Sequence, residues 1–279
     1  MQKIDAHQHF WQFDPVRDSW ITEEMSALKR DFLPADLFPI LERNEIDGSV
    51  LVQTCQTEDD NHFMLNLAKE NDFIKGIVGW VDLRADNIEE RLQYYKDNHA
   101  KLKGFRHVLQ TEPNEQFMLT RTFKRGINCL NDFQYTYDIL IYPRHLKYAD
   151  TLVAEFPDQK FVVDHLAKPH IKYQEIDEWK KDIEALSKYQ NVSCKVSGML
   201  TEADWYSWRT ADFTPYLDVV FNAFGISRVM YGSDWPVCVV AGGYNRALEI
   251  LQLYTSRLSH DEQDLFFGGN AADFYNLDK

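Results

Sequence analysis

The chain has 279 residues, of which 44% are hydrophobic and 14% aromatic, so it can bury a large core and is not composed like a disordered protein. Its 44 acidic residues outnumber 30 basic ones, and a net charge of −14 argues against nucleic acid and anionic membrane surfaces as partners. We find no secretory signal, no apolar run of membrane-spanning length and no C-x-x-C pair, so we expect a cytoplasmic protein with free thiols.

Eight short segments rich in β-branched and aromatic residues recur along the chain, with longer amphipathic stretches between them. We predict strands at residues 4–10, 48–54, 74–82, 102–109, 135–142, 160–166, 192–197 and 228–233. Their starts lie 25 to 44 residues apart, which leaves room for a crossover helix each time. The apolar centres at 48–52 and 160–163 suit strands that are buried on both faces.

The stretches between the strands have helical patterns. Residues 59–61 precede an apolar stripe as at a helix start, and Asp86 with Glu89 predicts a capped helix. Further helices are expected at 116–131, 145–156, 176–188, 212–224, 244–256 and 260–268. Strand and helix alternating eight times predict a single (β/α)8 barrel of the TIM type, forming one domain over residues 1–279. Residues 11–35 are expected to form a long first loop over the barrel mouth.

Polar residues stand at the end of nearly every predicted strand. In such barrels the chemistry lies at the carboxyl ends of the strands, so these positions predict a polar site. They are His7 and His9, Gln53, Trp80 and Asp82, Arg106 and His107, Tyr142 and Arg144, Asp164 and His165, Lys195, and Asp234 followed by Trp235.

The first strand and the last carry the sharpest candidates. His7 and His9 are two residues apart, so in an extended strand both point the same way and can share a cation. Asp234 follows an apolar strand within Gly232-Ser233-Asp234-Trp235-Pro236, where its carboxylate can take a proton from water or bind a metal. Asp164 is expected to orient a neighbour or to cap the barrel.

Together these features resemble the amidohydrolase superfamily. The residues that carry the resemblance are H-x-H on strand one, the lone His165 on strand six, G-S-D-W-P on strand eight, and the tail segment 268–275. The chain is most similar to the branch of sugar-lactone hydrolases, of the L-fuconolactonase and L-rhamnono-lactonase type, and to pyrone-dicarboxylate lactonases. The resemblance implies that His7, His9, His165 and Asp234 form the centre and that Asp234 activates water.

The chain departs from the binuclear amidohydrolases in two ways. Strand four ends in Arg106-His107 instead of a carboxylatable lysine, and strand five ends in Tyr142 instead of histidine. These departures remove a second metal. Two alternatives stay open, namely one divalent cation, zinc first, held by the three histidines and Asp234, or catalysis without a metal.

The expected function is hydrolysis of a sugar lactone to the aldonic acid. Asp234 is the predicted base, His165 and Arg106 are the other catalytic candidates, and the substrate-binding candidates are Gln53, His107, Tyr142, Lys195, Trp20 and Trp235. The alternatives are a metal-dependent decarboxylase of a small unsaturated acid and a pyrone-dicarboxylate lactonase. The expected partner is a small sugar lactone, and homo-oligomerisation stays open.

Overall fold

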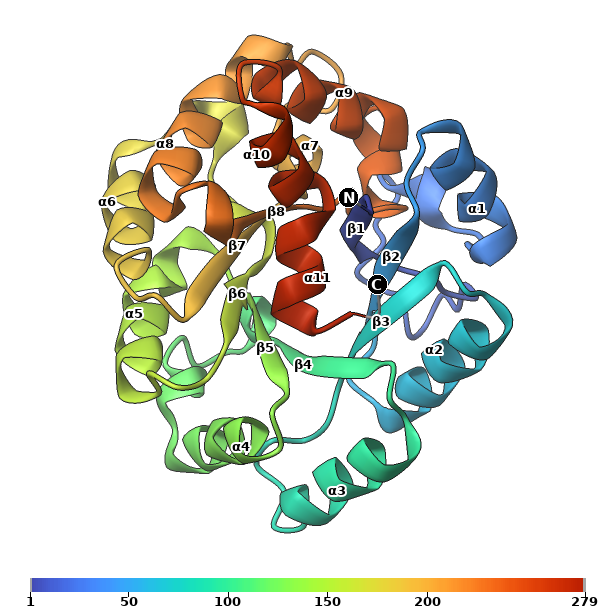
Figure 1. Cartoon of the computed structure of the whole chain (residues 1–279), viewed down its shortest axis with the longest axis vertical. Coiled ribbons are helices and arrows are strands. Elements are labelled where there is room, and N and C mark those ends of the chain that lie inside the picture. The colour runs from blue at the N-terminus through green and yellow to red at the C-terminus, as the bar shows by residue number, and fades with distance from the viewer. Residues whose placement is uncertain (1, 278–279) are drawn as a thin grey trace.

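The computed structural model describes residues 2–277, and all eight predicted strands form one parallel sheet in chain order (Figure 1). They are β1 (Ile4–Gln8), β2 (Gly48–Val52), β3 (Ile74–Gly79), β4 (Leu102–Val108), β5 (Thr136–Leu140), β6 (Phe161–Val163), β7 (Val192–Val196) and β8 (Val229–Tyr231). Past β8 the chain returns to β1, where the amide of His9 donates to the carbonyl of Trp235 at 2.7 Å. The ring is nearly closed, which confirms the (β/α)8 barrel.

Most helices form an outer layer around this ring, whereas α11 lies across it, as Figure 1 shows. They are α1 (Pro34–Arg43), α2 (Glu58–Glu70), α3 (Ile88–Asn98), α4 (Arg121–Asp132), α5 (Leu146–Glu155), α6 (Asp177–Leu186), α7 (Met199–Glu202), α8 (Thr214–Phe224), α9 (Tyr244–Thr255), α10 (His260–Asp264) and α11 (Asn270–Tyr275). None of the helices within residues 2–277 has the length and apolar character needed to cross a membrane. The predicted domain limits, residues 1 and 279, lie outside the described residues, and the single domain stays a prediction.

Three helix predictions need correction. Helix α1 was not predicted, although Pro34 occupies its first turn and the carboxylate of Asp36 accepts from the amide of Leu33 at 2.9 Å. Asp86 was predicted as a cap, but α3 begins two residues later and Asp86 pairs instead with Arg125 at 3.2 Å. The segment expected at 260–268 is α10 followed by a π-helical turn at 265–269.

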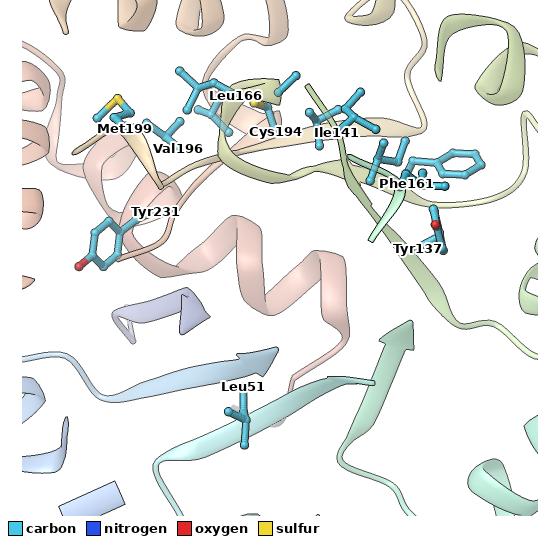
Figure 2. Close-up of a cluster of buried hydrophobic side chains, with 14 of the residues drawn as sticks. Leu51, Tyr137, Ile141, Phe161, Leu166, Cys194, Val196, Met199 and Tyr231 are labelled. Carbon is cyan, nitrogen blue, oxygen red and sulfur yellow. The ribbon is translucent and has the colours of Figure 1, made fainter. Parts of the chain in front are cut away.

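Alternating strand residues divide the apolar core into two clusters. Outward side chains pack between the strands and the surrounding helices, and Figure 2 shows several of them: Leu51, Tyr137, Phe161, Cys194, Val196 and Tyr231. Inward side chains pack inside the ring with residues of α11, which lies across the ring in Figure 1: Ile4, Ala6, Val50, Val52, Val78, Val162, Met230, Ala271 and Tyr275. Burying each large apolar side chain contributes about 1.5–3 kcal/mol, so both clusters hold the barrel in register.

Strand β1 contains a bulge that decides where its histidines point. In its pairing with β2, Asp5 lies opposite Ser49 and Gln8 opposite Leu51. Three steps along β1 therefore match two along β2, which means that β1 has one extra residue. The extra residue breaks the strict alternation, and His7 turns toward the barrel interior, where its side chain is fully buried. The side chain of His9, two residues later, points to the same side as that of His7.

Candidate active site

Four side chains predicted to form the centre converge at the carboxyl ends of the strands. His7 and His9 come from β1 and its exit, His165 follows β6, and Asp234 follows β8. The Nε2 atoms of His7 and His9 are 3.1 Å apart. The Oδ1 atom of Asp234 lies 3.6 Å from Nε2 of His9, 3.9 Å from that of His165 and 4.0 Å from that of His7. The carboxylate is therefore surrounded by three imidazoles.

An uncommon backbone conformation positions the side chains of two of these residues. His165 (φ 56°) opens a turn of four consecutive left-handed residues, 165–168, and Asp234 (φ 56°) has the same conformation. Each such residue costs on the order of 1–2 kcal/mol, which the surrounding packing must offset. Gly198 makes room for this turn, because a Cβ atom there would lie 2.6 Å from Nδ1 of His165. Strain of this kind, held at the strand ends, is typical of a functional site.

Contacts at the Nδ1 atoms, on the side of the ring away from the centre, orient His7 and His9. The Nδ1 of His9 donates to the carbonyl of Val52 at 2.7 Å, since a carbonyl can only accept. The Nδ1 of His7 lies 3.2 Å from Nζ of Lys195 and 3.3 Å from Oδ1 of Asp164, and Nη1 of Arg106 lies 3.3 Å from Nε2 of His7. A guanidinium only donates, so Nε2 of His7 accepts. The Nε2 atoms of both histidines face the centre, where they lie 3.1 Å apart.

His165 differs from the other two in its partner. Its Nδ1 lies 2.9 Å from the hydroxyl of Ser197, which can either donate or accept. Burial lowers the pKa of His7 well below its ordinary value and that of His165 to about 4, so both rings are neutral near pH 7. If Ser197 donates, His165 carries its proton on Nε2 and can offer it to a ligand.

A buried charge network lies beneath the histidines. The Nζ of Lys195 contacts Oδ2 of Asp138 and lies 3.1 Å from Oδ1 of Asp164. Asp164 also accepts from Nη1 of Arg106 at 2.9 Å, and the hydroxyl of Tyr275 donates to Asp138 at 2.8 Å. Burial opposes ionisation of Asp164, but Lys195 and His7 outweigh it and hold its pKa well below the ordinary value. Two carboxylates thus balance two cations inside the barrel.

Three predicted residues, Gln53, Arg106 and Lys195, contribute to this interior without facing solvent. Nη2 of Arg106 donates to the carbonyl of Gln53 at 2.6 Å and lies 3.3 Å from its side-chain oxygen. Lys195 is fully buried. Its contacts fit a role in positioning the centre better than direct contact with a substrate. Arg106 does reach the centre, through the Nε2 of His7.

Two further predicted residues lie outside the cluster. His107 turns away from the interior because its neighbour on β4 points inward. Its ring stacks on Phe117 with centroids 5.0 Å apart, and its Nε2 lies 2.7 Å from the carboxylate of Glu112. Trp235 is only 2% exposed and packs edge-on against Phe10. Direct substrate contact by either residue stays a prediction.

Tyr142 and Trp20 remain candidates for contact with a substrate at the edge of the site. The ring centre of Tyr142 lies 5.5 Å from Nζ of Lys168 and 4.9 Å from the guanidinium of Arg144. Trp20, in the long first loop, is 43% exposed and meets Trp11 edge-on. Both side chains therefore remain partly accessible for a ligand.

Asp138 and Asp5 were missed in the sequence. Asp5 accepts from the amides of Ser233 at 2.8 Å and His7 at 3.1 Å, and so ties the β8 exit to β1. Asp138 interrupts an apolar strand as Lys195 does, and two opposite charges in buried strands of one barrel were a signal that they pair. Asp164 was expected to orient a neighbour, and its contacts agree with that expectation.

The donor set fits a divalent cation. Ligand atoms of His7, His9 and Asp234 all lie within 4.8 Å of one another, as do those of His7, Asp164 and His165. Neutral imidazoles and a carboxylate are the ligands that zinc prefers. The first group fits better, because Asp164 in the second already binds Arg106 and Lys195. The contact between His7 and Asp164 has the form of a carboxylate orienting a metal-binding histidine.

Comparison with known proteins identifies the family. The family model described as "Amidohydrolase" matches residues 4–277. This chain belongs to the amidohydrolase family. The resemblance read from the sequence motifs is confirmed.

Two curated members of the family are similar over nearly their full length. The chain is 36% identical to an L-fucono-1,5-lactonase of Burkholderia multivorans and 33% identical to one of Burkholderia ambifaria. Each alignment covers 99% of this amidohydrolase and 96% of the relative. A crystal structure of an amidohydrolase from Burkholderia multivorans with bound zinc has 36% identity, full coverage of both chains and a TM-score of 0.95.

Proposed function

We propose that this amidohydrolase hydrolyses a sugar lactone of the L-fucono or L-rhamnono type to the aldonic acid. The observation that carries the proposal is the Asp234 carboxylate within 4.0 Å of three imidazole nitrogens, in a family member with two nearly full-length relatives that are L-fucono-1,5-lactonases. A buried carboxylate beside imidazole side chains can act as a general base toward a water that attacks an ester carbonyl.

In this mechanism Asp234 takes a proton from the attacking water. Burial opposes its ionisation, but the neighbouring imidazoles of His165 and His9 keep the pKa of Asp234 below its ordinary value. The carboxylate is therefore ionised near pH 7. The water oxygen bonds to the lactone carbonyl carbon, and the ring C–O bond then breaks. The proton held by Asp234 is available to the departing ring oxygen.

His165 and Arg106 face the negative charge that develops on the carbonyl oxygen. With Ser197 donating to Nδ1, the Nε2–H of His165 is the donor best placed to bind an oxyanion beside Asp234. Arg106 lies beside His7, with its Nη1 3.3 Å from the Nε2 atom that this ring turns toward the centre. Its guanidinium adds positive charge to the centre without leaving Asp164.

A divalent cation, zinc first, would be held by His7, His9 and Asp234, with His165 as the further candidate ligand. When bound, it would polarise the lactone carbonyl and lower the pKa of water. We expect purified protein to carry close to one equivalent of metal and a chelator to abolish turnover, both measured on the same sample. His9→Ala should lose the metal, whereas His62→Ala on the surface of α2 should keep it. Full activity in a chelated, metal-free sample would remove the metal from the mechanism.

Substrate class gives the experiment that tests the proposed function. We expect a 6-deoxy aldonolactone of the L-fucono or L-rhamnono kind to be preferred over a dicarboxylate lactone by at least about tenfold in kcat/KM, or about 1.4 kcal/mol. Two substrate carboxylates need several free cations. Here Arg106 and Lys195 bind buried aspartates, and Arg17 pairs with Asp18.

The same assay includes two variants. Trp20→Ala should reduce hydrolysis of the deoxy-sugar lactone more than that of the dicarboxylate, because an apolar ring face suits a methyl-bearing sugar. Lys195→Met should reduce both, since Lys195 supports the whole centre. Equal or faster hydrolysis of the dicarboxylate lactone by the unaltered protein contradicts the proposed substrate class.

A further inference from the structure

A second pair of charged side chains lies beside the centre. Lys168 is the last residue of the left-handed turn that begins at His165, and Glu202 is the last residue of α7. The Nζ of Lys168 and Oε1 of Glu202 are 3.9 Å apart, and the two side chains are 18% and 19% exposed. We call them the rim pair.

The position of the rim pair follows from the backbone around His165. The turn carrying Lys168 starts at that histidine, and α7 starts directly after Gly198, which packs against the same imidazole. Burial raises the pKa of Glu202 against the opposing charge of Lys168, and the negative charge of Asp234 adds to the rise. The negative charges of Glu202 and Asp234 therefore interact with each other.

The rim pair has unused hydrogen-bonding capacity. Within residues 2–277 neither its ammonium nor its carboxylate makes a hydrogen bond, and the separation of 3.9 Å is longer than a direct one. By contrast, the cations Arg106 and Lys195 are held closely by aspartates. Partly exposed charges with no hydrogen-bonding partner in the protein can take one from water or from a polar ligand.

We propose that Lys168 and Glu202 bind adjacent hydroxyl groups of the sugar lactone and thereby select a polyhydroxylated, uncharged ring. The inference rests on the proposed function and adds the residues that read the substrate. A carboxylate accepts from two neighbouring hydroxyls, and an ammonium donates to their oxygens. A ring bearing a carboxylate at the same position would face Glu202 and be repelled.

The test compares two lactones that differ in their hydroxyl groups. One is L-fucono-1,5-lactone, and the other is δ-hexanolactone, a six-membered ring with a methyl group and no hydroxyls. We expect Glu202→Gln and Lys168→Met each to lower kcat/KM for L-fucono-1,5-lactone by at least about tenfold, mainly through KM, and to change that for δ-hexanolactone by less than about threefold. If δ-hexanolactone is not turned over, its Ki as a competitive inhibitor replaces kcat/KM.

A matched control lies on the outer surface. Lys180 and Glu184 of α6 are separated by 4.0 Å, almost as in the rim pair, but both side chains are about half exposed. Glu184→Gln should leave both lactones unaffected. Glu202→Asp and Lys168→Arg keep the charges and should recover part of the loss for L-fucono-1,5-lactone, which a merely structural role would not predict.

Each remaining outcome decides the inference. Equal losses for both lactones, or no loss for L-fucono-1,5-lactone, would overturn hydroxyl recognition by the rim pair while leaving lactone hydrolysis intact. If the unaltered protein hydrolyses no aldonolactone, the proposed function itself fails. Thermal unfolding of each variant identifies one that does not fold, in which case the other member of the rim pair decides.

Discussion

Replacing Asp234 with asparagine is expected to lower kcat for the best lactone by about 10²-fold or more, the usual scale for a lost general base. Asparagine keeps the shape of the side chain but cannot take a proton from water. It also tolerates the left-handed backbone of this position (φ 56°), so the fold should survive. Steady-state kinetics together with a thermal unfolding curve measure both parts of the expectation.

The matched control for this variant is Asp86→Asn. The Asp86 carboxylate is fully exposed and pairs with Arg125 on the outer surface, so its loss should leave kcat unchanged. Turnover by Asp234→Asn close to that of the unaltered protein would show that another group accepts the proton. A loss of fold would instead show that this carboxylate is needed to hold the β8 exit.

The largest effect on stability is expected from Lys195→Met. The substitution keeps an unbranched side chain of nearly the same length but leaves Asp138 and Asp164 without their shared cation. Removing one partner of a buried ion pair typically costs about 3–5 kcal/mol, because an uncompensated charge stays in the interior. Unfolding by urea should show a loss of this size in the free energy of unfolding.

An exposed lysine provides the comparison for this measurement. The Nζ of Lys124 lies 2.7 Å from a carboxylate oxygen of Glu155, and both side chains are partly in contact with solvent. Lys124→Met should cost no more than about 1 kcal/mol, the usual upper value for a surface pair. If the two variants lost equal stability, the buried network would not be what holds the barrel interior together.

Most of the barrel could be predicted from local patterns. Apolar segments at regular spacing marked all eight strands, since a strand buried on both faces has few polar positions. The same logic located His7, His9, His165 and Asp234, because chemistry-bearing residues at strand ends stand out against that background. Helix α1 was missed because the apolar residues of 34–43 directly follow a long irregular loop.

What could not be predicted depends on contacts between distant strands. The bulge in β1 changes which side chains face inward, and no local pattern reveals an extra residue in a pairing. Asp138 and Lys195 are 57 positions apart and meet only when the ring closes. The rim pair depends on four consecutive left-handed residues that propensities disfavour, so packing around His165 overrides the local preference.

The contact between Tyr275 and Asp138 links the last helix of the chain to the interior of the barrel. The hydroxyl of Tyr275 donates to the same carboxylate oxygen that Lys195 contacts, and α11 packs on the inward residues of β1, β2 and β8. Protein synthesis makes His7 well before Tyr275. A nascent chain that ends before α11 therefore contains the histidines of the centre but lacks the helix that packs against the inward strand residues and donates a hydrogen bond to Asp138. We expect a growing polypeptide to become active only after α11 has been made and packed.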